Sequence, residues 1–414
     1  MANTAAPPPA KPGNGSAVIF ILLTVVINML GVGLAWPVLP KLVQTMGGGS
    51  VAEAAAAYAV IATAFAVMQF AFSPLVGMLS DRFGRRPVLL ISLAGLGVDY
   101  MLTAFAPDLI WLAAARIVGG IFGATATTAN AAMADISSPE TRARNFGYIG
   151  AAFGLGFILG PLVGGALGSV DIRLPFFAAA AMATFNVLFG LVFLPETLKR
   201  EHRRTIVRSE ANPFRAVRRI AAFPAILPLL IALFVTAIGQ RGLESNWVLY
   251  ADFRFGWDIR AAAWSLAFVG IASFAVQGFL VGPAVRRLGE WTAVFCGFAV
   301  SAVALGLFVF ADSGWLAYPL IGLHILGNGI ANPTLVAICS QSVDETRQGQ
   351  LQGVLNAVNA LAVVIGPFAA ALVLWEVARP MPVLNFPGAW FALSAVFYII
   401  AACLAYRHRA RQSP

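Results

Sequence analysis

A carboxylate and a guanidinium lie inside stretches of this sequence that are otherwise apolar. Asp99 comes six residues before the end of the stretch 88–105, and Arg116 comes seven residues after the start of the next one, 109–133. Since a helix rises about 1.5 Å per residue, both side chains would lie about 10 Å from the same end of two connected helices. They can form an ion pair there. A pair that breaks when the carboxylate takes up a proton would link protonation to conformation; the alternative is a static pair that braces two helices.

Other polar residues also interrupt apolar stretches. Arg241 and Glu244 are spaced three residues apart and share one face of a helix. They form either a pair at the edge of the apolar layer or part of a cavity, where Glu244 would carry a proton. His324 can titrate near neutral pH, although a single histidine of this kind is more commonly a hydrogen-bonding partner of a neighbouring helix. Gln69 and Gln277 are expected to line the interface between the two halves of the chain.

The chain as a whole is too apolar to be a soluble domain. Of its 414 residues, 59% are hydrophobic and 11% are charged, against about 25% charged in a typical soluble domain. Stretches of roughly 20 apolar residues cross a bilayer as helices, because backbone polar groups in lipid must bond within their own segment. We therefore predict an all-α membrane protein with twelve spanning helices, at 18–39, 57–79, 88–105, 109–133, 145–167, 174–194, 222–242, 261–285, 291–310, 315–338, 351–375 and 389–406.

Basic residues are distributed unevenly between the connecting segments. Twelve spans place both termini on one side of the membrane, and 20 of the 27 Lys and Arg residues fall on that side. The positive-inside rule then predicts an inner-membrane protein with cytoplasmic termini. The net charge of +9 is explained by this topology and by attraction to anionic lipid headgroups, so we expect no nucleic-acid partner.

No residue pattern indicates an enzyme, a metal site or a cofactor. Cys296, Cys339 and Cys403 all lie within predicted spans, at spacings that exclude a disulfide framework or a metal cluster. The three histidines are scattered, and the sequence lacks a nucleophile with a general base and a phosphate-binding loop.

Three landmarks recur in the second half of the chain at a nearly constant offset of 205 or 206 residues. They are Glu140-Thr141-Arg142 at 345–347, Gly77 and Gly84 at 282 and 289, and Gly160-Pro161 at 366–367. A duplication predicts two six-helix bundles with a binding site between them, near the middle of the bilayer. The predicted organisation is a disordered tail at 1–16, bundles at 17–195 and 221–406, a basic linker at 196–220 and a second tail at 407–414. Within the linker, residues 212–220 are expected to form a short basic helix on the membrane surface.

The first motif, GMLSDRFGRRP at 77–87, connects the second and third predicted spans. Gly77 is expected to permit close helix approach, and Gly84 permits a left-handed backbone. Asp81 is expected to lie against a helix N-terminus, where an anion is stabilised.

This motif resembles the loop signature of the major facilitator superfamily. The resemblance implies a cluster that holds the cytoplasmic side closed when the cavity opens outward, with Arg85 or Arg86 reaching Asp135. A solvated basic turn that only orients the protein is the alternative. The residues assigned to this cytoplasmic gate are Gly77, Asp81, Arg82, Gly84, Arg85, Arg86, Asp135 and Arg142.

The second motif is the glycine-rich span at 145–167. Small residues permit close helix packing, and a proline frees a backbone carbonyl and bends its helix. The ending GPLVGG at 160–165 resembles the antiporter signature of proton-driven drug exporters within the superfamily, which implies export. The residues assigned to it are Gly154, Gly160, Pro161, Gly164 and Gly165.

A narrower resemblance covers nearly the whole chain. Segments 36–40, 80–90, 99–100, 254–257 and 351–353 resemble the tetracycline efflux group, which exchanges a metal-chelated tetracycline for protons. The resemblance implies functional roles for the matching residues, which are Gln69, Asp99, Arg116 and Asp135.

Several positions depart from that group. Asn28 and Ser301 stand where the group has acidic residues, Ser273 stands where it has a histidine, and Met78 replaces a lysine. Arg241 and Glu244 have no counterpart in the group. These departures imply a relative whose substrate has changed.

Together these features favour a proton-coupled exporter of small amphipathic or hydrophobic compounds. A proton-coupled importer or metabolite exchanger of the same fold is the main alternative, and a membrane sensor that transports nothing is a third. We expect a monomer whose partners are the small-molecule substrate, protons and membrane lipids.

Overall fold

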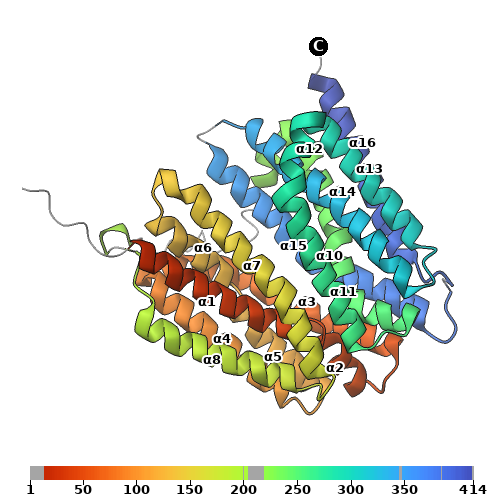
Figure 1. Ribbon diagram of the computed structural model, residues 1–414, viewed down its shortest axis with the longest axis horizontal. Coiled ribbons are helices and arrows are strands. Elements are labelled where there is room, and N and C mark those ends of the chain that lie inside the picture. The colour runs from red at the N-terminus through yellow and green to blue at the C-terminus, as the bar shows by residue number, and fades with distance from the viewer. Residues whose placement is uncertain (1–13, 199, 204–218, 345–346, 384, 413–414) are drawn as a thin grey trace, which may run out of the picture.

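The computed structural model confirms the predicted all-α fold. It describes residues 14–198, 200–203, 219–344, 347–383 and 385–412 (Figure 1). Within these ranges every regular element is a helix, and twelve are long and apolar enough to cross a membrane, as predicted. The tail before residue 14, residues 212–218 of the predicted helix at 212–220, and residues 345–346 of the repeated Glu-Thr-Arg landmark lie outside the described part of the chain.

The first six spans are built from eight helices, which we call the N-half. Two of these spans are interrupted, because α1 is followed by the short α2 and α5 is followed by α6. The helices are α1 (Asn14–Ala35), α2 (Leu39–Met46), α3 (Val51–Phe83), α4 (Arg85–Ala104), α5 (Leu109–Phe122), α6 (Thr125–Ile136), α7 (Pro139–Gly168) and α8 (Leu174–Phe193).

The last six spans form the C-half. Its second span is also interrupted, by a π-helical turn at Val276–Leu280. The helices are α10 (Leu227–Phe255), α11 (Ile259–Ala275), α12 (Val281–Leu288), α13 (Glu290–Phe308), α14 (Gly314–Gln341), α15 (Gln348–Ala378) and α16 (Ala389–Gln412). Between the halves the described residues form short 3₁₀ turns, including Arg219–Ala222.

The repeat is visible in backbone geometry. Gly84, between α3 and α4, has φ +113°, and Gly289, between α12 and α13, has φ +78°. A left-handed backbone of this kind favours glycine, because a side chain would be strained. The predicted conformation of Gly84 is therefore confirmed, and the same turn recurs in the C-half.

Glycines also set the closest helix crossings in both halves. Gly160 of α7 packs on Gly33 of α1, where a Cβ on Gly160 would lie 2.5 Å from the Gly33 Cα. In the C-half, Gly366 of α15 packs on α10, and a Cβ there would lie 2.7 Å from the Ile238 carbonyl oxygen. Ile238 follows Gly33 by the same offset of 205 residues. Close approach through small residues is a usual way for helices to associate in lipid.

The two halves approach each other at one side of the membrane. We call the side where α1 begins and α16 ends the terminal side, and the opposite side the distal side. In Figure 1 the helix groups converge around α2 and α11 and diverge towards α6 and α12. Polar contacts across the halves lie distally: Lys41 Nζ is 2.8 Å from Asp252 Oδ2, and Arg260 Nε donates to Ser169 Oγ at 2.8 Å.

The crossing of α7 on α1 is testable with two glycines of one motif. Gly160→Ala should lower the thermal stability of the purified protein, because overpacking a close contact costs about 1–3 kcal/mol. Gly154→Ala is the matched control, since nothing lies within 4 Å of a Cβ added there. The measurement is the unfolding temperature in detergent. Equal unfolding temperatures for the two variants would contradict this packing.

Candidate functional site

Asp99 of α4 and Arg116 of α5 form the ion pair expected from their depth in the sequence. The Asp99 side chain is fully buried and Arg116 is 6% exposed. Thr103, one turn further along α4, bonds to both: its Oγ1 accepts from Arg116 Nη2 at 3.1 Å and donates to Asp99 Oδ1 at 3.5 Å. Asp99 also packs directly against Gly119, where any side chain would collide with the carboxylate. The two helices therefore pack closely where Gly119 faces the carboxylate.

This pair lines a cavity of about 290 Å³, which we call the N-half cavity. The guanidinium carbon of Arg116 lies 5.7 Å from the Phe65 ring centre and 6.0 Å from that of Tyr100. Trp36, which directly follows α1, and Gln69 of α3 also line this cavity. A carboxylate and its counter-charge thus face the same internal space.

The fourth span is interrupted beside this cavity. α5 ends at Phe122 and α6 begins at Thr125, which frees backbone groups at mid-membrane depth. Gln69 Nε2 donates to the Gly123 carbonyl at 2.9 Å, and Asn28 Nδ2 donates to Thr125 Oγ1 at 3.1 Å. Irregular backbone in a membrane persists only where protein or a cavity satisfies it. The Gln69 bond therefore satisfies a backbone group at this interruption, and Asn28 binds the Thr125 side chain beside it.

In the C-half a chain of polar contacts crosses from α14 through α10 to α15. His324 Nε2 lies 2.8 Å from Gln240 Oε1, and Gln240 Nε2 donates to Glu244 Oε1 at 3.0 Å. Arg241 Nη1 lies 2.8 Å from Glu244 Oε2, and Arg241 Nη2 donates to Asn359 at 3.1 Å. His324 thus bonds a neighbouring helix, as the commoner interpretation predicted, and Arg241 and Glu244 pair on one face.

Glu244 and His324 line a second cavity, of about 90 Å³, which we call the C-half cavity. Most of its lining comes from the C-half, and Trp36 and Phe157 of the N-half close it. The Trp36 indole also donates to the Glu244 carbonyl oxygen at 3.4 Å, so the two halves meet at this point.

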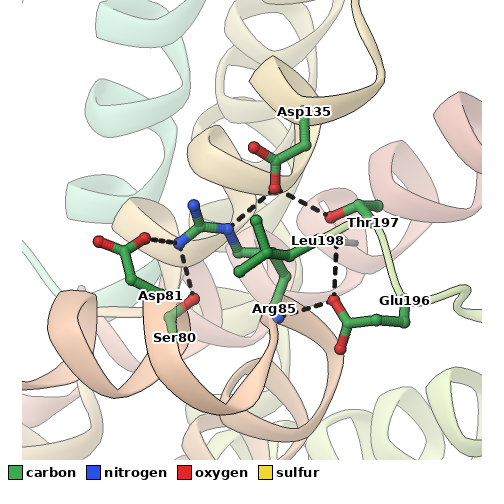
Figure 2. A network of polar contacts seen from close by, with 7 residues as sticks. All are labelled: Ser80, Asp81, Arg85, Asp135, Glu196, Thr197 and Leu198. Atoms are coloured by element: carbon green, nitrogen blue, oxygen red, sulfur yellow. Dashed lines mark hydrogen bonds and ion pairs between the residues drawn. The ribbon is translucent and has the colours of Figure 1, made fainter. Parts of the chain in front are cut away.

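The predicted gate residues on the terminal side form a network (Figure 2). Arg85 Nε donates to Asp135 Oδ2 at 2.9 Å, and Arg85 Nη1 is 2.5 Å from Asp81 Oδ1. Asp135 also accepts from Thr197 Oγ1 at 3.3 Å, and Glu196 accepts from the Arg85 backbone N–H at 2.9 Å. The start of the linker is thus bound to the loop and to the end of the fourth span.

Two expectations for this loop are wrong. Asp81 does not lie against a helix N-terminus, because it is in the last turn of α3 and binds the Arg85 side chain. Glu196 occupies the N-terminus of α4 instead. Gly77 does not mediate close helix approach, since nothing lies within 4 Å of a Cβ built there.

The other predicted residues are less closely connected to these clusters. Arg86 donates to the Leu191 carbonyl at 2.5 Å, and Arg82 lies over the Phe83 ring. The side chain of Arg142 lies outside the described part of the structure, and Gln277 is exposed in the π-helical turn of the C-half.

The glycines of the α7 motif pack against two different helices. Gly164 packs on Leu34 of α1, and Gly165 packs on Ala263 of α11 in the C-half. Gly154 faces open space, and Pro161 lies inside the helix. Gly160 and Gly164 therefore join helices of the N-half, while Gly165 contributes to the interface between halves.

Sequence reasoning missed Gln240, Glu196 and the Lys41–Asp252 ion pair. Gln240 is four residues before Glu244, so it shares a helix face with it, a signal that was available. Glu196 and the Lys41–Asp252 pair join segments far apart in the sequence, and no spacing rule connects them.

Comparisons with known proteins agree with this architecture. Residues 21–367 match the sequence profile of the Major Facilitator Superfamily. The chain is 39% identical over 369 residues to tetracycline resistance protein, class C, of Escherichia coli, covering 88% of this chain and 92% of that protein. It is 35% identical to the class G protein of Vibrio anguillarum, covering 95% and 98%, and 29% identical to multidrug resistance protein 2 of Bacillus subtilis, covering 86% and 88%.

Solved structures give the same result. The human organic anion transporter MFSD10 superimposes with a TM-score of 0.71 at 25% identity, covering 95% of this chain and all of that one. A bacterial homologue of the lysosomal transporter Spinster, in an inward-facing occupied conformation, gives a TM-score of 0.76 at 16% identity, covering 97% and 98%. The chain therefore belongs to the major facilitator superfamily of multi-pass membrane transporters, and it is not an enzyme.

Proposed function

We propose that this protein is a proton-coupled antiporter that exports small amphipathic or hydrophobic compounds across the inner membrane by alternating access. The observation that carries the proposal is the buried Asp99–Arg116 ion pair, which lines an internal cavity. Charged groups inside a membrane are costly, and they mark proton or substrate pathways by default. The relatives named tetracycline resistance proteins support drug efflux as the direction of transport.

In this proposal the terminal side is cytoplasmic, as the distribution of basic residues predicts. The polar contacts across the halves on the distal side then describe a state closed towards the outside. To release substrate outward, the halves must separate distally and the Lys41–Asp252 pair must break. The gate around Arg85 would hold the N-half loop in place as the terminal side closes.

The substrate is proposed to differ from tetracycline. Ser301, which stands where the tetracycline group has an acid, is fully buried and donates to the His324 carbonyl at 3.2 Å. A Cβ on Gly327 of the neighbouring helix would lie 2.6 Å from the Ser301 Oγ. A longer acidic side chain has no room at this helix crossing. In this proposal the carboxylate of the C-half cavity is therefore Glu244.

Export can be measured with inverted membrane vesicles and an imposed pH gradient. Uptake of amphipathic compounds from a panel is expected when the vesicle interior is acidic, and collapse of the gradient should abolish it. Vesicles without the protein are the control. Solute movement that ignores the gradient would contradict proton coupling, and gradient-driven movement in the opposite direction would indicate an importer.

Asp99→Asn is expected to abolish gradient-driven uptake, because the variant cannot exchange a proton at the Arg116 contact. Removing one partner of a buried pair also leaves a charge uncompensated, at a cost of about 3–5 kcal/mol. The double variant Asp99→Asn with Arg116→Gln should therefore recover thermal stability without recovering transport. Gradient-driven transport by a stable double variant would mean that the pair only braces two helices.

Asp81→Ala is expected to slow turnover without abolishing substrate binding, since it removes a ligand of Arg85 from the gate. Glu201→Ala is the control, because Glu201 is an exposed acid in the nearby 3₁₀ turn Arg200–His202. Transport rate and equilibrium binding are measured in parallel. If turnover is unchanged in Asp81→Ala, the loop serves only to orient the protein.

A further inference from the structure

The C-half cavity has a lining of aromatic rings from both halves of the molecule. Phe308 and Phe391 stack with ring centres 4.2 Å apart, and Trp247 packs edge-on against Phe308 at 5.8 Å. On the opposite wall, Trp36 and Phe157 meet edge-on at 4.8 Å. The faces of such rings carry partial negative charge and attract cations.

The charge of this lining is negative. Among the described residues that line the cavity, Glu244 is the one carboxylate, and neither Lys nor Arg takes part. The N-half cavity differs, because Asp99 and Arg116 both line it and neutralise each other. Of these two cavities, the C-half cavity is therefore the one whose described lining holds a carboxylate without a lining cation.

The ion pair with Arg241 leaves the Glu244 carboxylate able to bind another cation. The Arg241 side chain is 36% exposed and that of Glu244 is 26% exposed. Ion pairs with this much solvent contact add little to the free energy of folding. Arg241 is also held by Asn359 of α15, so it has a second partner when Glu244 takes another cation. Arg241 itself does not line the cavity.

Gln240 fixes how the polar side of the cavity is arranged. Its amide nitrogen donates to Glu244, so its carbonyl oxygen faces His324 and accepts from the His324 Nε2. His324 is 8% exposed and its Nδ1 has no partner in the described structure. The cavity wall therefore offers a hydrogen-bond acceptor as well as a carboxylate, and both are suited to a positively charged donor.

We propose that the C-half cavity binds an aromatic organic cation, with Glu244 as its counter-charge. This deepens the proposed function, since it names the charge class of the exported compound. Binding displaces Arg241 from the Glu244 Oε2, and the aromatic rings enclose the apolar body of the ligand. Export by proton exchange would then use Asp99 for the proton and Glu244 for the substrate.

Equilibrium binding to the purified full-length protein tests this without any transport step. Phenyltrimethylammonium and tert-butylbenzene have nearly the same shape and differ by one positive charge, so the pair isolates the effect of charge. Saturable binding is expected for the cation and not for the neutral compound. Equal affinity for both, or tighter binding of the neutral compound, would overturn the proposal with the unmodified protein alone.

Variants then locate the site. Glu244→Gln should weaken phenyltrimethylammonium binding by about tenfold or more, and Arg241→Gln should tighten it because the competing cation is gone. Glu376→Gln is the matched control, since Glu376 forms a similar pair with Arg379, three residues apart and 23% exposed, outside this cavity. Undiminished binding in a folded Glu244→Gln variant would overturn the assignment.

The outcomes separate this inference from the proposed function. If cation binding depends on Glu244 but a proton gradient drives no transport, the result supports the site and contradicts the antiport proposal. Cation binding that is lost in Asp99→Asn but kept in Glu244→Gln places the ligand in the N-half cavity and overturns the inference.

Discussion

A charged side chain inside a bilayer must find its partner within the protein, and this constraint governs the structure. Asp99 is fully buried at membrane depth, and its counter-charge comes from the next helix. Because a lone carboxylate there would be costly, α4 and α5 are held in the register that brings Arg116 to it. In the proposed mechanism a proton acts at this contact, because a neutral Asp99 no longer holds Arg116.

The same rule applies to the backbone where the fourth span is interrupted. Gln69 bonds to the Gly123 carbonyl at this break, and Asn28 bonds to the Thr125 hydroxyl beside it. In the C-half the polar groups form a chain around Glu244, and the aromatic cavity lies beside it. The two halves share a repeat in their turns and crossings, but they have acquired different polar sites. One cavity contains a neutral pair and the other a carboxylate, which suits a division between proton and substrate.

Much of the fold was predictable because it depends on local patterns. Hydropathy identified the twelve spans, the constant offset predicted a duplicated turn at Gly84 and Gly289, and helix spacing predicted the Arg241–Glu244 pair. The wrong expectations concerned Gly77 and Asp81, whose contacts depend on how neighbouring helices are placed in one conformation. Contacts between distant segments, such as Lys41 with Asp252, carry no signal in spacing or composition.

In the proposed mechanism, protonation of Asp99 changes how the two halves contact each other. Spin labels at Val170 and Met381, which are exposed at the distal ends of the two halves, report the distance across that side in a variant lacking the three native cysteines. We predict that the distance distribution shifts between acidic and alkaline pH, and that Asp99→Asn removes the shift. An unchanged distribution at both pH values in a transport-active protein would contradict the account.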